Sequence, residues 1–151
     1  MNIINNHIII TAILIIAINI FAYLHSYLFI TFKTGNTTRI QKTGERPNLD
    51  YLRSHTPRFL VNVVSLILLS GAGLYFFYDY IIDINKTSIL HIVIPVFIIF
   101  IIDDIFFYFV HRLIHVNKFL YKKIHRIHHE ANMPVAIDYI YAHPLEWMVG
   151  Y

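Results

Sequence analysis

The sequence contains no cysteine among its 151 residues. This absence excludes disulfide bonds, thiolate zinc sites, iron–sulfur clusters and covalently attached c-type haem. Any metal ion that the chain binds must therefore have nitrogen or oxygen ligands. Charged residues are also scarce, at 14% of the chain, whereas hydrophobic residues make up 57%. Soluble globular domains have about 25% and ~45–50% respectively, so the composition excludes a disordered chain and an ordinary water-soluble protein.

The chain also lacks a concentrated basic patch, although its formal net charge is +3. Its basic residues are spread through the segments between the apolar runs, so they do not indicate a nucleic-acid partner. We interpret them as signals of membrane topology. The chain length accommodates one domain, which we expect to cover residues 1–151.

Three apolar runs are long enough to cross the hydrocarbon core of a membrane, which takes about 20 helical residues. They extend over residues 8–32, 59–82 and 89–110. We expect helices in all three, because a membrane-spanning segment must satisfy its backbone hydrogen bonds internally. The first run is expected to stay as an anchor, since no Lys or Arg precedes it and no cleavage site follows it. The sequence therefore predicts an all-α membrane bundle with three transmembrane helices.

Lys and Arg residues are concentrated in two of the segments outside the apolar runs. Residues 33–58 and 111–126 carry eleven of them, whereas residues 83–88 carry Lys86 alone. Because Lys and Arg accumulate on the cytoplasmic side, we expect the two basic segments to be cytosolic and the amino terminus to lie opposite. The first basic segment is predicted to be a turn-rich connector from its glycines and prolines, Gly35, Gly44, Pro47 and Pro57.

Six of the ten histidines lie within 33 residues, directly after the third apolar run. His111 and His115 form an HxxxH pair, and a spacing of four residues places both imidazoles on one face of a helix. His125, His128 and His129 form an HxxHH cluster, whose first member shares a helical face with the other two. Two helices that present several imidazoles toward a common point would form a metal site, and such a site suits iron, copper or zinc.

Acidic and aromatic residues extend this pattern on both sides. Asp104 and Tyr108 lie on the same helical face as the HxxxH pair. A carboxylate within an apolar span costs about 2.5–3.5 kcal/mol, and support of a ligating imidazole would explain Asp104. Farther along, Pro144 is suited to a first helical position and predicts a short helix. That helix would bring His143 and Glu146 back toward the cytosolic face.

Other interpretations of the histidines stay open at this point. The HxxxH pair lacks the glutamate that a zinc-peptidase HExxH motif requires, which disfavours metalloprotease chemistry. His128 and His129 alone would form a basic patch at the lipid headgroups of a purely structural membrane protein. A membrane cytochrome with haem held by two histidines is a further hypothesis. Four histidines outside the two clusters are not predicted to be ligands: His7, His25, His55 and His91.

The combined pattern resembles the fatty acid hydroxylase and sterol desaturase superfamily of integral-membrane, non-haem di-iron oxygenases. The resemblance rests on Asp104 and Tyr108, on the histidine clusters at 111–115 and 125–129, and on the Tyr-Ala-His-Pro-Leu-Glu segment at 141–146. This last segment is most similar to the 4-methylsterol monooxygenase branch. Two further matches to family positions are less specific, namely Arg39-Ile40-Gln41 and Asn62.

The resemblance implies a di-iron site with imidazole ligands and supporting residues around them. It implies dioxygen-dependent hydroxylation or desaturation of a sterol or fatty-acyl lipid, with electrons from NAD(P)H passed through a reductase and a small haem protein. It also implies an endoplasmic-reticulum-type membrane with residues 111–143 in the cytosol. The implied ligands are His111, His115, His125, His128, His129 and His143, and the implied supporting residues are Asp104, Tyr108 and Glu146.

The sequence departs from the family pattern at its carboxy-terminal side. Family members continue through another membrane segment to a third histidine cluster, whereas here an apolar stretch begins at Leu145 and the sequence stops at Tyr151. We therefore expect a bundle that is truncated before its fourth span and cannot coordinate two irons alone. The remaining ligands would come from a carboxy-terminal segment or a second chain, or the chain would be a catalytically inactive remnant.

Overall fold

The computed structural model describes residues 3–32, 46–81, 88–131 and 133–150. These four ranges contain helices and no strand, which confirms the predicted all-α fold. The elements, where η denotes a 3-10 helix, are α1 (Ile3–Thr31), α2 (Leu49–Ile81), α3 (Ile89–Val116), α4 (Lys118–Lys123), η2 (His125–Glu130), η3 (Ala136–Ile140) and α5 (Pro144–Gly150).

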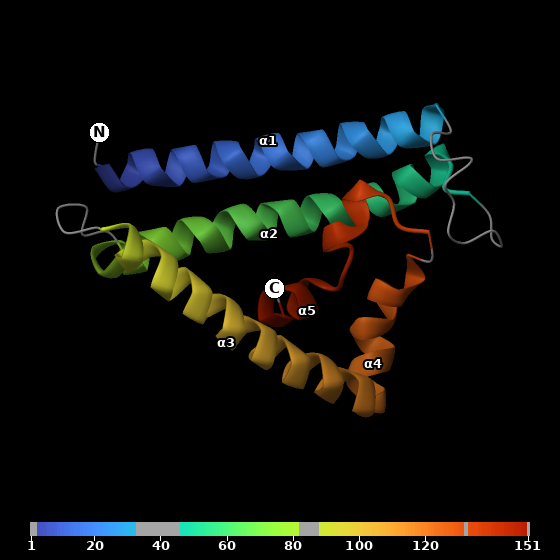
Figure 1. Cartoon of the computed structure of the whole chain (residues 1–151). Helices are drawn as coiled ribbons and strands as arrows, with labels where there is room; N and C mark the ends of the chain where they lie inside the picture. Colours follow the sequence, from blue (N-terminus) through green and yellow to red (C-terminus); the bar gives the residue numbers. More distant parts are fainter. Residues whose placement is uncertain (1–2, 33–45, 82–87, 132, 151) are drawn as a thin grey trace.

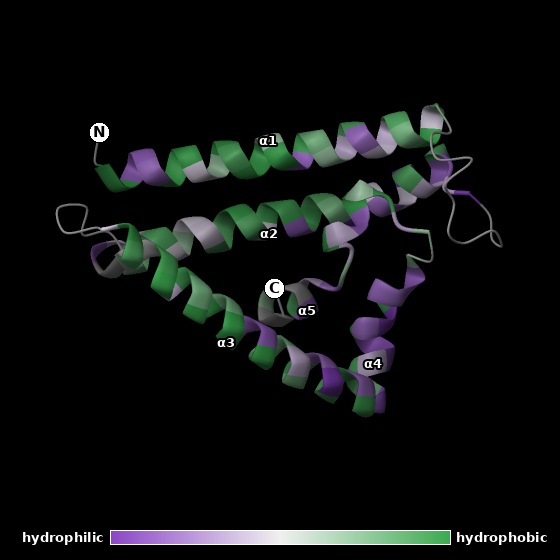
Figure 2. Cartoon of the chain, in the orientation of Figure 1, coloured by the Kyte–Doolittle hydropathy of each residue, from purple (hydrophilic) through white to green (hydrophobic). Residues whose placement is uncertain are grey.

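Three of these helices are long and apolar enough to cross a membrane: Ile3–Thr31, Leu49–Asp79 and Val93–Val116. Hydrophobic residues dominate α1, the central part of α2, and α3 in Figure 2, whereas α4 and η2 are largely hydrophilic. Large apolar side chains cover the outer surfaces of all three helices. Such surfaces are suited to lipid and not to water. The prediction of a membrane bundle with three transmembrane helices is confirmed.

The second helix begins ten residues before its predicted start at residue 59. Asn48 Oδ1 accepts a hydrogen bond from Tyr51 N at 2.8 Å and so satisfies one of the free backbone N–H groups at the start of α2. Pro57, predicted in the turn-rich connector, lies inside α2. The connector is therefore shorter than predicted, and its Arg39-Ile40-Gln41 segment lies outside the described residues.

The third helix is also longer than predicted. It continues beyond residue 110 to Val116, so that His111 and His115 belong to the same helix as the membrane span. Asn117 ends α3 by donating its N–H to Leu113 O at 2.9 Å. The HxxxH pair therefore sits on a continuous helix, at the end of the span.

The elements form an open triangle in the view of Figure 1. Helices α1 and α2 run antiparallel side by side along one edge, and α3 runs from the far end of α2 along a second edge. The chain turns at the end of α3 into α4 and η2, and then returns to α2 through η3. Helix α5 contacts both α2 and α3, which places the carboxy-terminal segment between them.

The short helix η3 is anchored on α1 and α2 at the hydrophobic core. That core comprises Ile30, Leu52, Phe59, Val63, Ile137, Ile140 and Ala142. Polar side chains of α1 also hold η3: Ser26 Oγ accepts from Ile137 N at 3.0 Å, and Asn19 Oδ1 accepts from Tyr139 Oη at 2.9 Å. In an apolar environment these hydrogen bonds are favoured because the groups have no water to bind.

Asn62 on α2 fixes the segment that leads into α5. Its side chain is fully buried, and Nδ2 donates to Ile140 O at 2.6 Å and to Ala142 O at 3.1 Å. These carbonyl groups lie at the end of η3 and in the segment that follows it, where Ile140 O also accepts a hydrogen bond from Ala142 N at 2.9 Å. Asn62 therefore positions the residues that immediately precede His143.

Candidate metal centre

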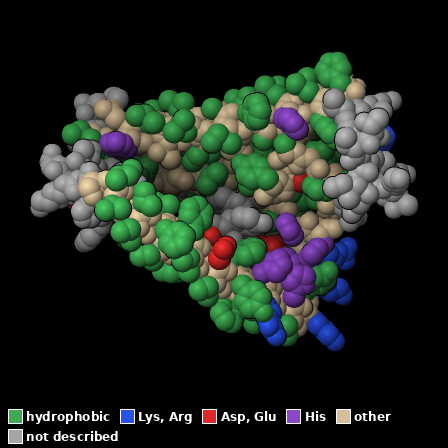
Figure 3. Space-filling model, in the orientation of Figure 1, with side chains coloured by type: hydrophobic (Ala, Val, Ile, Leu, Met, Phe, Trp, Pro, Cys, Tyr) green, Lys and Arg blue, Asp and Glu red, His purple; other side chains and the backbone are tan. Residues whose placement is uncertain are grey.

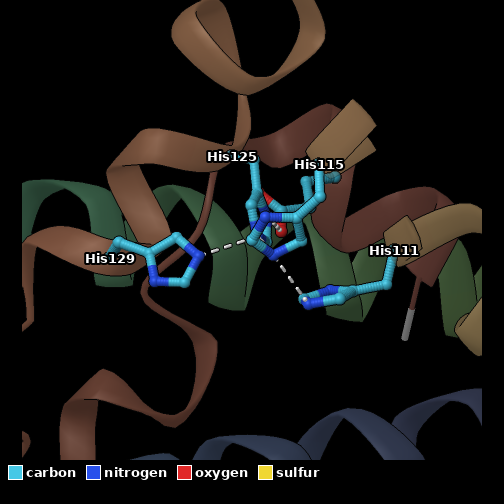
Figure 4. Close-up of polar contacts among 5 residues, drawn as sticks. His111, His115, His125 and His129 are labelled. Carbon is cyan, nitrogen blue, oxygen red and sulfur yellow. Dashed lines mark hydrogen bonds and ion pairs between the residues drawn. The ribbon is translucent and has the colours of Figure 1, made fainter. Parts of the chain in front are cut away.

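Four imidazoles meet at the junction of α3, α4 and η2. His115 Nε2 lies 3.2 Å from His111 Nε2 and 2.9 Å from His125 Nε2, and His129 Nε2 lies 2.9 Å from His125 Nε2. Figure 4 shows His115 and His125 between His129 on one side and His111 on the other. We call His111, His115, His125 and His129 the imidazole cluster. Three of its members, all except His129, can offer ligand atoms that lie within 4.8 Å of one another.

The spacing of the imidazole cluster fits a bound metal ion. Two nitrogens that bind one metal at about 2.1 Å lie ~3.0 Å apart at a right angle and ~3.4 Å apart at the tetrahedral angle. The consecutive Nε2 distances of 2.9, 3.2 and 2.9 Å are close to this range. Without a metal, the Nε2 lone pairs of two neighbouring imidazoles repel each other unless one of the two nitrogens carries a proton. A bound cation accepts both lone pairs and removes this repulsion. The donor set of nitrogen ligands without thiolate is suited to iron, copper or zinc.

A tight turn at Asn117 brings the two histidine clusters together. Asn117 Oδ1 accepts hydrogen bonds from Phe119 N at 3.0 Å and Leu120 N at 3.1 Å, and so caps α4 directly after α3 has ended. Helix α4 has only six residues, so the chain returns to the end of α3 within two turns. Because of this turn, His125 reaches His115 although ten residues separate them in sequence.

The HxxHH cluster lies on a 3-10 helix and not on the α-helix that its spacing suggested. His125 and His128 have nearly parallel rings, with an interplanar angle of 26° and centroids 5.6 Å apart. His125 and His129 are instead nearly perpendicular, at 85° and 4.6 Å. The perpendicular arrangement turns the two Nε2 atoms toward each other, whereas the stacked arrangement does not. His129 therefore joins the imidazole cluster, and His128 packs beside it.

Glu146 is hydrogen-bonded to His125, the member of the imidazole cluster that lies between His115 and His129. His125 is completely buried, and its Nδ1 donates to Glu146 Oε1 at 2.5 Å. A proton on Nδ1 leaves the lone pair on Nε2, which faces His115 and His129. Carboxylates that bind the outer nitrogen of a ligating histidine fix its tautomer and ring orientation and increase its basicity. Glu146 occupies this position, and α5 begins at Pro144 as predicted.

The electrostatics of the cluster favour neutral imidazoles at its edge. Desolvation lowers the pKa of His129, and the neighbouring His125, His128 and His115 lower it further, while Glu146 acts in the opposite direction. A neutral imidazole is the form that binds metal. His129 is therefore ready to bind a cation without first losing a proton at neutral pH.

Three other predicted site residues lie apart from the imidazole cluster in the described structure. His143 Nδ1 accepts from Leu145 N at 3.2 Å at the start of α5, and its ring makes no contact with the clustered imidazoles. Tyr108 Oη accepts from Arg112 Nη1 at 2.8 Å on the exposed side of α3. Asp104 is exposed and has no polar partner among the described residues. The geometry therefore gives none of these three a contact with a candidate ligand.

Tyr121 is a neighbour of the cluster that the sequence analysis missed. Its ring centroid lies 5.7 Å from that of His115, 5.9 Å from that of His125 and 6.0 Å from that of His129. It precedes His125 by four residues, and this spacing could have identified it. Tyr121 closes the α4 side of the cluster with an aromatic surface.

The histidines outside the two clusters have other surroundings. His7 lies against Tyr78, and His25 lies between Phe21 and Phe29. The ring of His55 stacks between two tyrosines of α2 and of the segment after η3. None of these three makes a contact with the imidazole cluster in the described ranges, and the side chain of His91 lies outside them.

Comparison with known proteins places the candidate centre in a matched segment. Residues 96–151 match the family model described as fatty acid hydroxylase. This segment contains the imidazole cluster and Glu146. The resemblance to the fatty acid hydroxylase and sterol desaturase superfamily is thereby confirmed for this part of the chain. No solved structure matches the chain.

The proteins that are similar to this chain are named as several different lipid enzymes. The chain is 49% identical to methylsterol monooxygenase 1 of Rattus norvegicus over 49 residues, which are 32% of this chain and 16% of that protein. It is 42% identical to sphinganine C4-monooxygenase 2 of Arabidopsis thaliana over 65 residues, 43% of this chain and 25% of that protein. It is 55% identical to the very-long-chain aldehyde decarbonylase GL1-9 of Oryza sativa subsp. japonica over 42 residues, 28% and 16% respectively. The chain thus spans a quarter or less of the length of these relatives.

Proposed function

We propose that this chain supplies part of the iron centre of a membrane-bound, non-haem oxygenase that hydroxylates or desaturates a sterol or fatty-acyl lipid. The observation that carries the proposal is the convergence of His111, His115 and His125 at the end of a membrane span, with ligand atoms within 4.8 Å of one another and His129 Nε2 lying 2.9 Å from His125 Nε2. The relatives named above as monooxygenases support the same class of reaction. Bound iron would supply the dioxygen chemistry, which amino-acid side chains alone cannot perform.

The residues of this chain would hold and orient the metal. His111, His115 and His125 would hold one ion, His129 would be the neighbouring ligand beside His125, and Glu146 would keep the proton of His125 on Nδ1 so that Nε2 stays free to bind. His128 and His143 stay predicted ligands of a second iron, for which they would have to turn toward the centre. We also propose that the site receives electrons from NAD(P)H through a reductase and a small haem protein.

The position of the site favours a lipid substrate. The span Val93–Val116 exposes apolar side chains along its length and ends at the imidazole cluster. A lipid lying against α3 would therefore have its polar end, or an adjacent carbon, near the metal. We propose that the membrane is of the endoplasmic-reticulum type, and that the cluster faces the cytosol because the basic segments flank it.

Two irons need more ligands than the imidazole cluster provides. We propose that the additional ligands come from a carboxy-terminal segment or a second chain. This proposal is in keeping with the open arrangement of α3, whose residues 93–106 are all exposed. If no such partner exists, the chain is a metal-binding but catalytically inactive protein.

The geometry disfavours the two other hypotheses. A haem would have to separate its two axial imidazoles by the porphyrin ring, whereas the Nε2 atoms of the imidazole cluster lie within contact distance. A headgroup patch of His128 and His129 would point its imidazoles away from the protein, whereas His129 Nε2 is turned toward the completely buried His125, 2.9 Å from its Nε2.

Iron content tests the proposed function directly. The full chain, purified in nanodiscs and loaded anaerobically with ferrous iron, should retain iron after removal of free metal. The double variant His115→Ala/His129→Ala should lose it, because two of four ligands are gone. The matched control is His25→Ala, which removes an imidazole from an exposed position on α1.

Equal iron retention by the His115→Ala/His129→Ala variant and by His25→Ala would contradict the proposed site. The lipid reaction is tested separately with the iron-loaded chain, its carboxy-terminal partner segment and a chemical reductant. A sterol or fatty-acyl lipid should then gain one oxygen atom or lose two hydrogen atoms, as measured by mass spectrometry. An unmodified lipid in the presence of bound iron and dioxygen would contradict the oxygenase activity while leaving the metal site intact.

A further inference from the structure

The outer surface of α4 and η2 carries exposed basic side chains beside the imidazole cluster. Lys118, Lys122 and Lys123 are exposed on α4, and Arg126 is exposed on η2. Figure 3 shows basic groups gathered next to the histidines at this corner of the molecule. None of the four cations forms an ion pair with a carboxylate in the part of the chain that the structure describes. Their charge is therefore available to a partner outside the protein.

Apolar side chains continue from the end of α3 onto the same surface. Leu113, Val116 and Phe119 are 59%, 74% and 68% exposed, respectively. The membrane span ends at Val116, and the cap at Asn117 starts α4 without an intervening loop. Phe119 therefore adds an exposed apolar side chain on α4 next to the lipid-facing surface of α3. Apolar side chains flanked by Lys and Arg at the end of a span are typical of segments that lie in the membrane interface.

We propose that α4 lies in the membrane–water interface and binds the phosphate groups of anionic lipids through Lys118, Lys122 and Lys123. Ammonium groups form charge-assisted hydrogen bonds with phosphate oxygens, and clustered basic residues near a membrane surface attract anionic lipids. Phe119 enters the boundary between headgroups and acyl chains. A lipid is the partner, in preference to an acidic soluble protein, because the apolar surface is continuous with the lipid-facing surface of α3.

The opposite face of α4 links this lipid contact to the imidazole cluster. Residues of an α-helix follow one another at 100° around its axis, so Phe119 and Lys123 lie ~160° from Tyr121, Lys122 lies ~100° from it and Lys118 lies ~60° from it. The Tyr121 ring is within 6.0 Å of the ring of each of His115, His125 and His129, measured between centroids. Headgroups bound on the outer face thus hold α4 in place while its inner face supports the candidate ligands. Only this consequence for metal binding rests on the proposed function.

The absence of native cysteine allows a single probe to report on α4. Phe119→Cys, labelled with the polarity-sensitive fluorophore NBD, is prepared in the full chain. It is reconstituted in nanodiscs of phosphatidylcholine or of equal parts phosphatidylcholine and phosphatidylglycerol. We expect a blue-shifted emission and protection from aqueous iodide in the anionic discs. About 1 M NaCl should reverse the shift, because the Debye length is then only ~3 Å.

A charge variant and its control identify the side chains responsible. In the labelled background, Lys118→Gln/Lys122→Gln/Lys123→Gln should abolish the difference between the two kinds of disc. Arg46→Gln/Arg53→Gln is the control, because Arg46 just before α2 and Arg53 in its second turn are exposed basic residues away from α4 and should leave the difference unchanged. Equal emission and equal iodide access in both discs, for the labelled chain without charge substitutions, would overturn the inference. The basic surface would then have no contact with anionic lipid and would be open to an acidic soluble protein.

Iron retention measured in the same discs keeps the two proposals distinguishable. We expect severalfold tighter iron binding in the anionic discs, and loss of this difference in the triple glutamine variant. Iron retained equally in all discs, together with no response of the probe to lipid, would overturn the lipid contact alone. A probe that responds to anionic lipid in a chain that binds no iron would overturn the proposed function alone.

Discussion

At the scale of single residues, the two adjacent histidines of the HxxHH cluster have different surroundings. His129 Nε2 lies 2.9 Å from His125 Nε2, whereas His128 stacks beside His125. We expect His129→Ala to lower the iron affinity at least tenfold, because it removes a ligand. His128→Ala should change the affinity of this chain much less. Competition with a chelator measures both, and equal losses in the two variants would contradict the difference in their roles.

The carboxylate behind His125 gives a second prediction. Glu146→Gln keeps the size of the side chain but removes the charge that supports the Nδ1 proton of His125. Loss of such a partner typically lowers metal affinity about 10–100-fold, and we expect this range here. Glu130→Gln is the control, since Glu130 is an exposed carboxylate on η2. An iron affinity that is unchanged in Glu146→Gln, measured by the same competition, would show that the hydrogen bond has no role in binding.

The lowered pKa of His129 predicts a pH dependence of the metal-free chain. An unfolded histidine has its ordinary pKa of 6.5, so between the lowered native pKa and 6.5 the unfolded state binds more protons. The free energy of unfolding should therefore rise with pH across this interval, and only slightly because the ring is exposed. Denaturation at a series of pH values measures this slope, which His129→Ala should reduce. A slope of opposite sign, or one that is the same in the variant, would contradict the assignment.

The residue pattern predicted part of this site and not the rest. The four-residue spacing of His111 and His115 was sufficient to predict that their imidazoles lie together, because both residues lie on one α-helix. The same rule treats His128 and His129 alike, and only the 3-10 geometry of η2 separates them. Contact between His125 and Glu146 spans 21 residues and depends on the path of the chain through η3, which no local spacing encodes.

At the scale of the elements, the contact between α2 and η3 positions α5 and its carboxylate, Glu146. Asn62 donates two hydrogen bonds to the carbonyl groups of Ile140 and Ala142. Asn62→Ala would remove the side-chain donor from both carbonyls; Ile140 O keeps the N–H of Ala142, whereas the loss at Ala142 O should cost about 1–3 kcal/mol. We expect a lower thermal midpoint and weaker iron binding, since α5 carries Glu146.

Ser65→Ala is the matched control for this prediction. Ser65 lies one turn farther along α2, and its hydroxyl donates only to Val61 O of the same helix at 2.9 Å. Thermal unfolding of both variants in nanodiscs gives the comparison. Equal midpoints for Asn62→Ala and Ser65→Ala would show that the contact with η3 contributes nothing to stability.

The long helices were predictable, but their starts and ends were not. Apolar runs identify the part of each helix that lies in lipid, whereas the first three turns of α2 are amphipathic and stabilised by packing. Leu52 and Phe59 are buried against η3, and Pro57 is exposed on the other side. The glycines and prolines of residues 33–58, Pro57 among them, predicted a connector there, because no local pattern reveals the tertiary partner.

At the scale of the whole molecule, the fold brings the end of one membrane helix to a polar corner where a metal can meet a lipid. Helices α1 and α2 provide the support, η3 and α5 supply the carboxylate, and α3 with η2 supplies the imidazoles. The three apolar runs were enough to predict a three-helix membrane bundle. It could not predict the triangular arrangement, because this depends on a few polar contacts of Asn19, Ser26 and Asn62.

X-ray absorption at the iron K-edge of the full chain, loaded with iron in nanodiscs, tests the central claim most directly. We predict a shell of nitrogen and oxygen neighbours with the outer-shell scattering of at least three imidazoles, and a loss of this scattering in His115→Ala/His129→Ala. Iron that shows no imidazole scattering, or a spectrum that this double substitution leaves unchanged, would contradict a histidine metal centre at the end of α3.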